Sequence, residues 1–264
     1  MGEPSQVQQE AAQRLLRAYE THTPIPPLTA DFPELTVEDA YGIQLEQVRR
    51  WTEDGRTVVG HKVGLTSAAM QKQLGVTEPD FGHLFADFVY AEHEPIPADR
   101  FLQPRVEPEI AFVLKSPLAG PGVTVTQAIA AVDYVLPALE VVDSRVADWK
   151  ITLADTIADN ASSGGYVLGS TPTPLHEVDL RLVGCVFHRN AQVIGTGAGG
   201  AVLGSPITSL VWLANTLGAL GTTLEAGEVI LPGSVTAMSP VAPGDTFTAT
   251  FAGLGSVTAR FAHS

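Results

Sequence analysis

The stretch Arg105-Val106-Glu107-Pro108-Glu109-Ile110-Ala111-Phe112-Val113-Leu114 alternates polar and apolar side chains in its first half and is apolar in its second half. This pattern is typical of a β-strand, in which successive side chains point to opposite faces. Glu107 and Glu109 therefore share one face of the strand, with Arg105 beside them, while Ile110 faces a core. The strand is predicted to present two adjacent carboxylates.

Two neighbouring carboxylates repel each other, and burying them without a partner costs free energy. A third carboxylate, Glu140, interrupts another apolar run at residues 135–142. A bound divalent cation would remove the repulsion. Three carboxylates without a cysteine or histidine partner predict a hard cation, Mg²⁺ or Mn²⁺, with coordination positions left open for a substrate. The alternative is that Glu107, Glu109 and Glu140 form ion pairs on the surface of a sheet, because charged strand faces are common.

The composition is that of a globular protein with a large core. The chain has 264 residues, of which 45% are hydrophobic and 17% charged, enough for one large domain. We find no apolar run as long as a membrane span and no signal sequence at the N-terminus. The net charge of −14 argues against nucleic acid or an anionic membrane as partner. The single cysteine, Cys185, rules out an internal disulfide and predicts a cytoplasmic location.

The N-terminal part of the chain is predicted to form a helical cap. Residues 5–20 have the apolar spacing of an amphipathic helix. A second helix starts near Thr36, with Asp39 three residues on as in a capping box. Two such helices are too short to enclose their own core. We therefore expect all 264 residues to form a single catalytic domain, with a helical cap at 1–55 and a metal-binding β core at 56–264.

Strand patterns predominate after the cap. Strands are predicted at 58–65, 105–114, 229–231, 246–251 and 256–261, and a hairpin at 183–193. Helices are predicted at 67–74, 127–134, 148–159 and from Ser205 to Gly218. Residues 77–84 are predicted to form a loop. The whole indicates one α+β domain with a long, mainly antiparallel β core.

Two polar residues stand out near the first predicted strand. Lys62 lies in the apolar segment 58–65, where it is either a lysine whose amine reaches solvent or a catalytic or substrate-binding amine. Burial would lower its pKa and nearby carboxylates would raise it, so its charge stays open. Asp80, between Pro79 and Phe81, has the pattern of a turn residue, and the pattern alone favours that role.

Other motifs carry less weight. Residues 195–200 match G-x-G-x-x-G, but no strand–turn–helix unit surrounds them, so we expect close backbone approach rather than a dinucleotide site. The seven histidines lack metal-ligand spacing, and His61 is expected to point away from the face of Lys62. Cys185 lies in an apolar hairpin and no nucleophile elbow is present, which argues against nucleophilic catalysis.

A polar segment follows the predicted helix at 148–159. Asp155 and Asp159 are four residues apart and would share a helix face, where they either orient ligands of a site or cap the helix end; the structural role is favoured for Asp159. Ser162 and Ser163 lie in a glycine-rich turn, whose hydroxyls and amides could bind a substrate carboxylate.

Several ordered blocks of the sequence resemble one known family. They lie at 60–67, 75–82, 104–110, 136–145, 158–162, 226–231 and 253–257 and include Gly60-His61-Lys62-Val63-Gly64-Leu65-Thr66-Ser67, Pro79-Asp80-Phe81-Gly82, Pro104-Arg105-Val106-Glu107-Pro108-Glu109-Ile110 and Leu136-Pro137-Ala138-Leu139-Glu140. From about residue 36 to the C-terminus, the chain resembles the 2-oxopent-4-enoate (2-hydroxypenta-2,4-dienoate) hydratase family of the fumarylacetoacetate hydrolase superfamily.

The resemblance implies a fold and a site. The fold would be α+β, with a mixed β-roll core around a divalent cation. Independently of the resemblance, the turn that contains Ser162 and Ser163 is a candidate for binding substrate. The predicted site consists of Glu107, Glu109 and Glu140 as metal ligands, Lys62 and Asp80 as catalytic residues, and Ser162 as a substrate-binding residue.

The resemblance also implies an activity. A member of this family adds water to 2-hydroxypenta-2,4-dienoate in aromatic meta-cleavage catabolism, giving 4-hydroxy-2-oxopentanoate; it would be a homo-oligomer, with a downstream aldolase as a candidate partner. The related 4-oxalocrotonate decarboxylases share the glutamates, although residues 79–82 and 148–151 look more like the hydratases. Two further alternatives are a non-catalytic partner subunit of a pathway enzyme and a β-diketone hydrolase, for which no histidine is placed to activate water.

Overall fold

The structure is a computed structural model that describes residues 4–68, 71–72 and 75–263. The predicted helix at 67–74 lies partly outside these residues. The helices are α1 (Gln6–Thr21), α2 (Leu28–Asp31), α3 (Val37–Glu53), α5 (Val125–Ala131), α6 (Leu153–Ala158) and α7 (Pro206–Ala219). The strands are β1 (Val58–Gly64), β2 (Asp80–Phe85), β3 (Val89–Tyr90), β4 (Arg105–Leu114), β5 (Val132–Val142), β6 (Ser163–Leu168), β7 (Gly184–Arg189), β8 (Gln192–Ala198), β9 (Val229–Leu231), β10 (Ser239–Pro240), β11 (Thr246–Phe251) and β12 (Gly255–Arg260).

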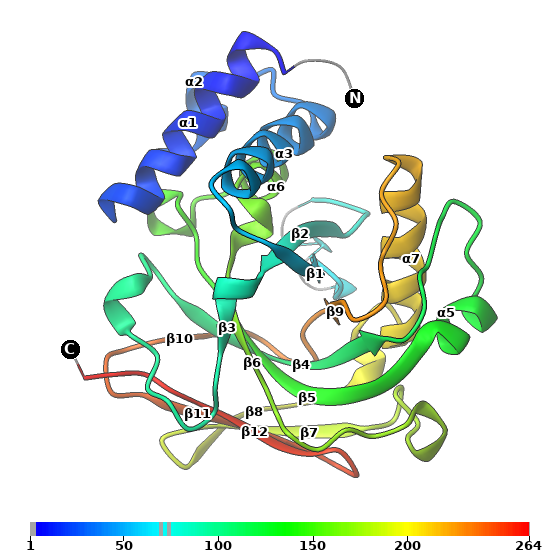
Figure 1. The fold of residues 1–264 in the computed structure, drawn as a ribbon. Coiled ribbons are helices and arrows are strands. Elements are labelled where there is room, and N and C mark those ends of the chain that lie inside the picture. Colours follow the sequence, from blue (N-terminus) through cyan, green and yellow to red (C-terminus); the bar gives the residue numbers. More distant parts are fainter. Residues whose placement is uncertain (1–3, 69–70, 73–74, 264) are drawn as a thin grey trace.

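A curled, mixed sheet forms the centre of the molecule (Figure 1). Among the described residues it has eight strands in the order β2-β1-β9-β4-β5-β6-β3, with β10 paired to β4. β1 and β9 are parallel, as are β3 and β6, and the other pairs are antiparallel. β4 and β5 pair from Arg105 opposite Val142 to Leu114 opposite Val132. The predicted α+β class with a mixed β-roll core is confirmed.

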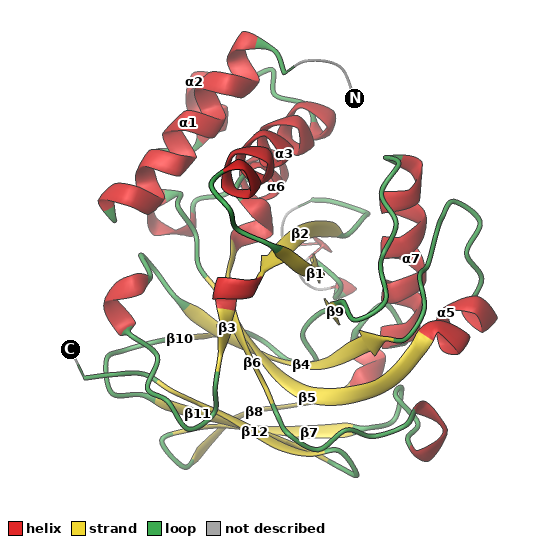
Figure 2. Ribbon diagram, viewed as in Figure 1, coloured by secondary structure: helices red, strands yellow, loops and turns green. Residues whose placement is uncertain are grey.

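A second sheet, in the order β12-β11-β7-β8, packs on the convex side of β5 (Figure 2). Apolar side chains that alternate along the strands of both sheets fill the space between them. Leu139 and Val141 of β5 belong to the same buried cluster as Phe187, Phe247 and Phe251. Truncating a core phenylalanine to alanine costs about 3–5 kcal/mol, so this layer contributes strongly to the stability of the fold around β5.

The N-terminal helices pack against α6 on the other side of the molecule (Figure 1). The predicted capping box of Thr36 and Asp39 is present at the start of α3. Leu15 of α1 and Ile43 of α3 form a buried cluster with Ile157 of α6. The helical cap therefore shares its core with a segment that leads directly into the predicted site.

Two buried glutamines of α3 fix neighbouring segments of the site. The side-chain amide of Gln44 donates to the carbonyl oxygens of Phe81 at 2.9 Å and Ile157 at 2.8 Å. Gln47 donates to the carbonyl oxygen of Ala158 at 2.7 Å. Leaving such buried carbonyls unpaired would cost about 1–3 kcal/mol each, so α3 ties β2 to α6.

The helical stretch Gly199–Ala219, which ends with α7, corrects the prediction that no apolar run is long enough for a membrane span. This stretch meets that description by length and composition only. However, Leu210, Leu213 and Leu217 are buried in the main core. The hydropathy of this stretch is therefore that of a core helix, and the start of α7 at Pro206 after Ser205 is as predicted.

The predicted loop at 77–84 is wrong from residue 80 onward. Asp80–Phe85 form β2, which is buried throughout and antiparallel to β1. Gly82 is typical of a turn, but here it lets β2 pass close to the backbone of Asn160. A Cβ atom at residue 82 would lie 2.4 Å from the carbonyl oxygen of Asn160.

Two predicted helices are shorter than expected. α5 starts after Thr124 and ends at Ala131, because the β-branched and aromatic residues that follow join strand β5. In place of one helix at 148–159, only Leu153–Ala158 is α-helical. Asp148 and Trp149 interrupt it with φ angles of 58° and 56°. The hairpin at 183–193 is confirmed as β7 and β8.

Candidate active site

Strands β4 and β5 bring the three predicted carboxylates together. Glu107 lies directly opposite Glu140 in the antiparallel register, and Glu109 follows two residues later on the same strand face. One carboxylate oxygen from each residue lies within 4.8 Å of the others. Glu109 and Glu140 are fully buried and Glu107 is partly exposed. Glu109 and Glu140 therefore do not lie on a solvated sheet surface.

Burial and mutual repulsion disfavour the charged forms of these glutamates. Burial, followed by repulsion from Glu140, raises the pKa of Glu107 to about 7. The same two causes raise the pKa of Glu109 well above its usual range. Burial also raises the pKa of Glu140, although attraction by Lys62 opposes this. A positive ion among the three carboxylates would relieve the repulsion.

Lys62 of β1 reaches this cluster. Its Nζ lies 3.5 Å from Oε1 of Glu140 and donates a hydrogen bond to the carbonyl oxygen of Ala161 at 2.9 Å. The side chain is buried, so it is not a lysine whose amine reaches bulk solvent. Burial lowers its pKa, but attraction by Glu140, Asp80 and the other two glutamates outweighs burial and raises the pKa of Lys62 above its usual value. The ammonium group is therefore charged at neutral pH.

Asp80 is not a turn residue. It is the first residue of β2, pairs with Gly64 of β1 and is 1% exposed. Its Oδ1 has no hydrogen-bond partner among the described residues. Burial raises the pKa of Asp80, and attraction by Lys62 only partly offsets this effect. A buried carboxyl group with a free oxygen and a raised pKa is suited to proton transfer.

A strained turn follows α6 and borders the site. Asn160, Ala161 and Ser162 have φ angles of 50°, 49° and 53°, in the left-handed region that costs about 1–2 kcal/mol per non-glycine residue. The buried guanidinium of Arg145 supports the turn, because its Nε donates to Oδ1 of Asp159 at 2.5 Å. Asp159 thus has a structural contact, and the turn places the Ser162 hydroxyl at the site.

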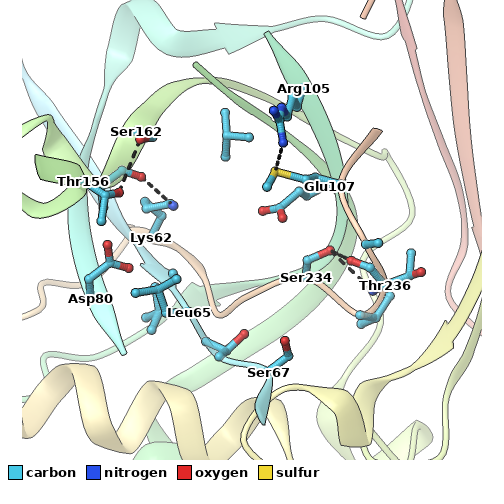
Figure 3. Close-up of a pocket in the computed structure, with 18 of the residues that line it drawn as sticks. Lys62, Leu65, Ser67, Asp80, Arg105, Glu107, Thr156, Ser162, Ser234 and Thr236 are labelled. Carbon is cyan, nitrogen blue, oxygen red and sulfur yellow. Dashed lines mark hydrogen bonds between the residues drawn. The ribbon is translucent and has the colours of Figure 1, made fainter. Parts of the chain in front are cut away.

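A cavity of about 480 Å³ is lined by Lys62, Asp80, Glu107 and Ser162. Glu109 and Glu140 lie next to Glu107, behind this lining. Figure 3 shows Lys62, Asp80 and Glu107 pointing into the cavity from three different strands. The hydroxyl of Ser162 lies at its edge, 3.3 Å from Oγ1 of Thr156. The apolar part of the wall includes Leu65, Val142, Trp149, Ile151, Val235 and Met238. The cavity has the size of a small-molecule site with a few convergent polar groups.

The free oxygen atoms of the glutamates fit a divalent cation. Oε1 of Glu109 and both carboxylate oxygens of Glu140 are buried without a hydrogen-bond partner in the described part of the chain. The other oxygen of Glu109 accepts a hydrogen bond from the backbone N–H of Gly233 at 2.8 Å, which orients the carboxylate. An all-oxygen donor set of this kind suits a hard cation such as Mg²⁺, Mn²⁺ or Ca²⁺.

The other sequence candidates lie away from the cavity. His61 points to the opposite face of β1 from Lys62, as predicted, with its ring 4.9 Å from that of His83. Cys185 is buried, and burial raises its pKa to about 12. In the G-x-G-x-x-G segment, a Cβ atom on Gly197 would lie 1.9 Å from the carbonyl oxygen of Val235, which confirms a close backbone approach.

Several cavity residues were not predicted from the sequence. Trp149, Thr156 and the loop 234–238 all line the cavity, and Arg105 was noted only as a neighbour of the glutamates. The alternation of β4 already places Arg105 on the face of Glu107. No sequence pattern indicates the positive φ of Trp149, so its position depends on tertiary contacts.

Comparisons with known proteins agree with this geometry. The fumarylacetoacetate (FAA) hydrolase C-terminal family matches residues 52–262. A 2-keto-4-pentenoate hydratase of Paraburkholderia xenovorans (strain LB400) is 50% identical over 97% of this chain and 95% of its own length. A 4-oxalocrotonate decarboxylase of Pseudomonas putida is 45% identical over 93% of this chain and 92% of its own.

A solved structure extends the comparison to three dimensions. The 4-oxalocrotonate decarboxylase of Pseudomonas putida G7, complexed with magnesium and adipate, superimposes with a TM-score of 0.93 at 43% identity, covering 97% of each chain. The chain therefore belongs to the fumarylacetoacetate hydrolase superfamily and, within it, to the 2-keto-4-pentenoate hydratase family, as the sequence resemblance implied.

Proposed function

We propose that this protein is a metal-dependent hydratase that converts 2-hydroxypenta-2,4-dienoate to 4-hydroxy-2-oxopentanoate in aromatic meta-cleavage catabolism. The observation that carries the proposal is the gathering of three buried or partly buried carboxylates with Lys62 and Asp80 around one cavity. The 50% identity to a hydratase over nearly the whole chain supports the reaction type.

In this proposal Glu107, Glu109 and Glu140 hold the cation, Mg²⁺ or Mn²⁺. A magnesium ion in the related decarboxylase supports a divalent metal. When bound, the ion would supply Lewis-acid stabilisation of negative charge on the 2-oxygen of the substrate. If all groups are ionised, the three clustered glutamates and Asp80 outnumber the cations Lys62 and Arg105 by two charges, which a divalent ion would neutralise.

Lys62 and Asp80 have different proposed roles. The Lys62 ammonium, which lines the cavity beside Glu140, stabilises negative charge that develops on the 2-oxygen. Asp80 transfers protons and orients water, since it has a free buried oxygen and a raised pKa. Ser162 helps to hold the substrate carboxylate from the edge of the cavity.

The proposed reaction has two stages. The 2-hydroxyl group first loses its proton and C5 gains one, which gives a conjugated 2-oxo-3-enoate. A water molecule then adds its hydroxyl group to C4 and its proton to C3. Both stages pass through an enolate at C2, so the same stabilisation of the 2-oxygen serves each of them.

Decarboxylation of 4-oxalocrotonate is the second candidate function. The TM-score of 0.93 with a decarboxylase favours it, and the same enolate would form after loss of carbon dioxide. The test supplies the purified chain and Mg²⁺ with each substrate in turn and follows products by NMR and carbon dioxide release. Hydration of the dienoate without carbon dioxide release from 4-oxalocrotonate supports the proposal. Carbon dioxide release without hydration rejects it.

We also infer a homo-oligomer in the cytoplasm, with an aldolase that consumes the 4-hydroxy-2-oxo acid as a downstream partner. The buried, unpaired Cys185 fits a reducing compartment. Light scattering and co-purification with the aldolase test these inferences.

A further inference from the structure

Arg105 is a cation of the cavity that forms no ion pair with the described residues. It lies two residues before Glu107 on the same face of β4 and lines the cavity. Its Nη1 donates only to the sulfur atom of Met238, at 3.8 Å, and a thioether is a weak acceptor. A guanidinium has five N–H donors, so Arg105 retains donors for a ligand.

The other cations near the cavity are already engaged. Lys62 contacts Glu140 and donates to Ala161. Arg145 is paired with Asp159. By contrast, Arg105 is half-buried, and its guanidinium is charged at neutral pH, as arginines in proteins are. A desolvated cation of this kind favours an anionic partner.

Trp149 forms a platform for the guanidinium. The Cζ atom of Arg105 lies 4.4 Å from the Trp149 ring centroid, within the range of a cation–π interaction. The indole N–H of Trp149 donates to the carbonyl oxygen of Gln103 at 3.0 Å, and the backbone N–H of Asp148 donates to Oε1 of Gln103 at 2.7 Å. The fold thus maintains two consecutive positive φ angles to hold this ring in place.

We propose that Arg105 binds the carboxylate group of the 2-oxo acid substrate, with Trp149 fixing the plane of the guanidinium. This inference rests on the proposed function for the identity of the substrate. Even with a divalent ion and the Lys62 ammonium in place, the four ionised carboxylates of the site would leave one net negative charge without Arg105, which would oppose a substrate carboxylate. A planar guanidinium matches a carboxylate with two parallel hydrogen bonds. Figure 3 shows Arg105 projecting toward the cavity, on the far side from Asp80.

The test measures binding of 2-oxopentanoate, a saturated monocarboxylate with no double bond to hydrate. Isothermal titration calorimetry compares the Mg²⁺-loaded wild type with Arg105→Met and Arg105→Lys. The control, Arg17→Met, removes the same charge from the exposed surface of α1. We expect the Kd for 2-oxopentanoate to rise by about 10- to 100-fold in Arg105→Met, because hydrogen bonds to charged groups are strong. The Kd should rise by less in Arg105→Lys, because lysine keeps the positive charge but cannot make the two parallel hydrogen bonds of a guanidinium. Arg17→Met should match the wild type.

Two results would overturn the inference. One is an unchanged Kd for 2-oxopentanoate in Arg105→Met at equal metal occupancy. The other is weaker binding of the dicarboxylate 2-oxoadipate alone, which would place Arg105 at the far end of the substrate. If Arg105→Met does not fold, an unchanged Kd in Arg105→Lys counts against the inference and a raised Kd supports it. The proposed function can fail separately from this inference. If the wild type binds 2-oxopentanoate but does not hydrate the dienoate, and the Arg105 variants lose 2-oxopentanoate binding, the proposed function is rejected while the role of Arg105 stands.

Discussion

The ammonium of Lys62 lies 3.5 Å from a carboxylate oxygen of Glu140, and both side chains are buried. The pair joins β1 to β5, which are separated by β9 and β4 in the sheet. It therefore places a fixed positive charge beside the carboxylate cluster and on the wall of the cavity.

Replacing Lys62 by methionine should lower kcat by about 10²- to 10⁴-fold, the range for loss of a group that acts in proton transfer or charge stabilisation. Metal affinity should not fall, because the change removes a positive charge from beside Glu140. Steady-state kinetics and Mn²⁺ titration by electron paramagnetic resonance measure the two quantities. If Mn²⁺ affinity falls enough to account for the lost activity, Lys62 acts by stabilising the metal site and not in turnover itself.

Glu109→Gln should abolish metal-dependent turnover while preserving the fold. Even partners that only orient ligands cost about 10- to 100-fold in metal affinity when mutated, so loss of a ligand should cost more. The amide can still accept the hydrogen bond from Gly233. Circular dichroism and metal analysis check the prediction, and Glu94→Gln is the exposed control. Full activity of Glu109→Gln would exclude the carboxylate cluster as the metal site.

Asp80→Asn should lower kcat with little change in Mg²⁺ affinity, since Asp80 is separate from the three gathered carboxylates. A loss of about 10²- to 10⁴-fold is expected for a general acid or base. Thermal melts test whether the buried amide is tolerated. A folded Asp80→Asn variant with wild-type kcat would remove Asp80 from the mechanism.

The carboxylate cluster should make stability fall with rising pH, an effect that bound metal should oppose. The folded-state pKa of Glu107, about 7, exceeds its usual value of 4.5, so the folded state binds more protons between those values. Without metal, this contribution to the free energy of unfolding decreases as pH rises through that window. Mg²⁺ binds the charged form and should therefore raise Tm more at pH 8 than at pH 5.5. Calorimetry that finds equal Mg²⁺-induced shifts at both pH values would contradict this.

Arg145→Met should destabilise the protein by about 3–5 kcal/mol, because it leaves Asp159 buried without its partner. The turn at Asn160–Ser162 would lose its support, and the carbonyl of Ala161 holds Lys62. Urea unfolding measures the free energy. A loss below about 1 kcal/mol, typical of a surface ion pair, would show that the turn is held by other contacts.

The sequence pattern predicts the part of the site that depends on strand alternation. Glu107 and Glu109 follow from the period of β4, and Glu140 was identified because a charge interrupts an apolar run. Their pairing across β4 and β5 needs only antiparallel neighbours. These features are local, so composition and period are sufficient to find them.

The remainder depends on tertiary contacts that no local pattern encodes. Asp80 resembles a turn residue because Pro79 and Gly82 flank it, yet β1 recruits the segment as a strand. The left-handed turn after α6 adjoins Asp159, which Arg145 binds from another segment. Trp149 reaches the cavity through two positive φ angles. Such conformations are intrinsically unfavourable and persist only where surrounding structure enforces them.

Metal-dependent consumption of 2-hydroxypenta-2,4-dienoate tests the central claim most directly. The freshly generated dienoate is mixed with the purified protein, and the ultraviolet absorbance of the diene is followed with Mg²⁺ or Mn²⁺ and again after excess chelator. We predict rapid loss of the diene band with 4-hydroxy-2-oxopentanoate as product, and its arrest by the chelator. Loss no faster than the spontaneous rate in the presence of metal would contradict the hydratase assignment.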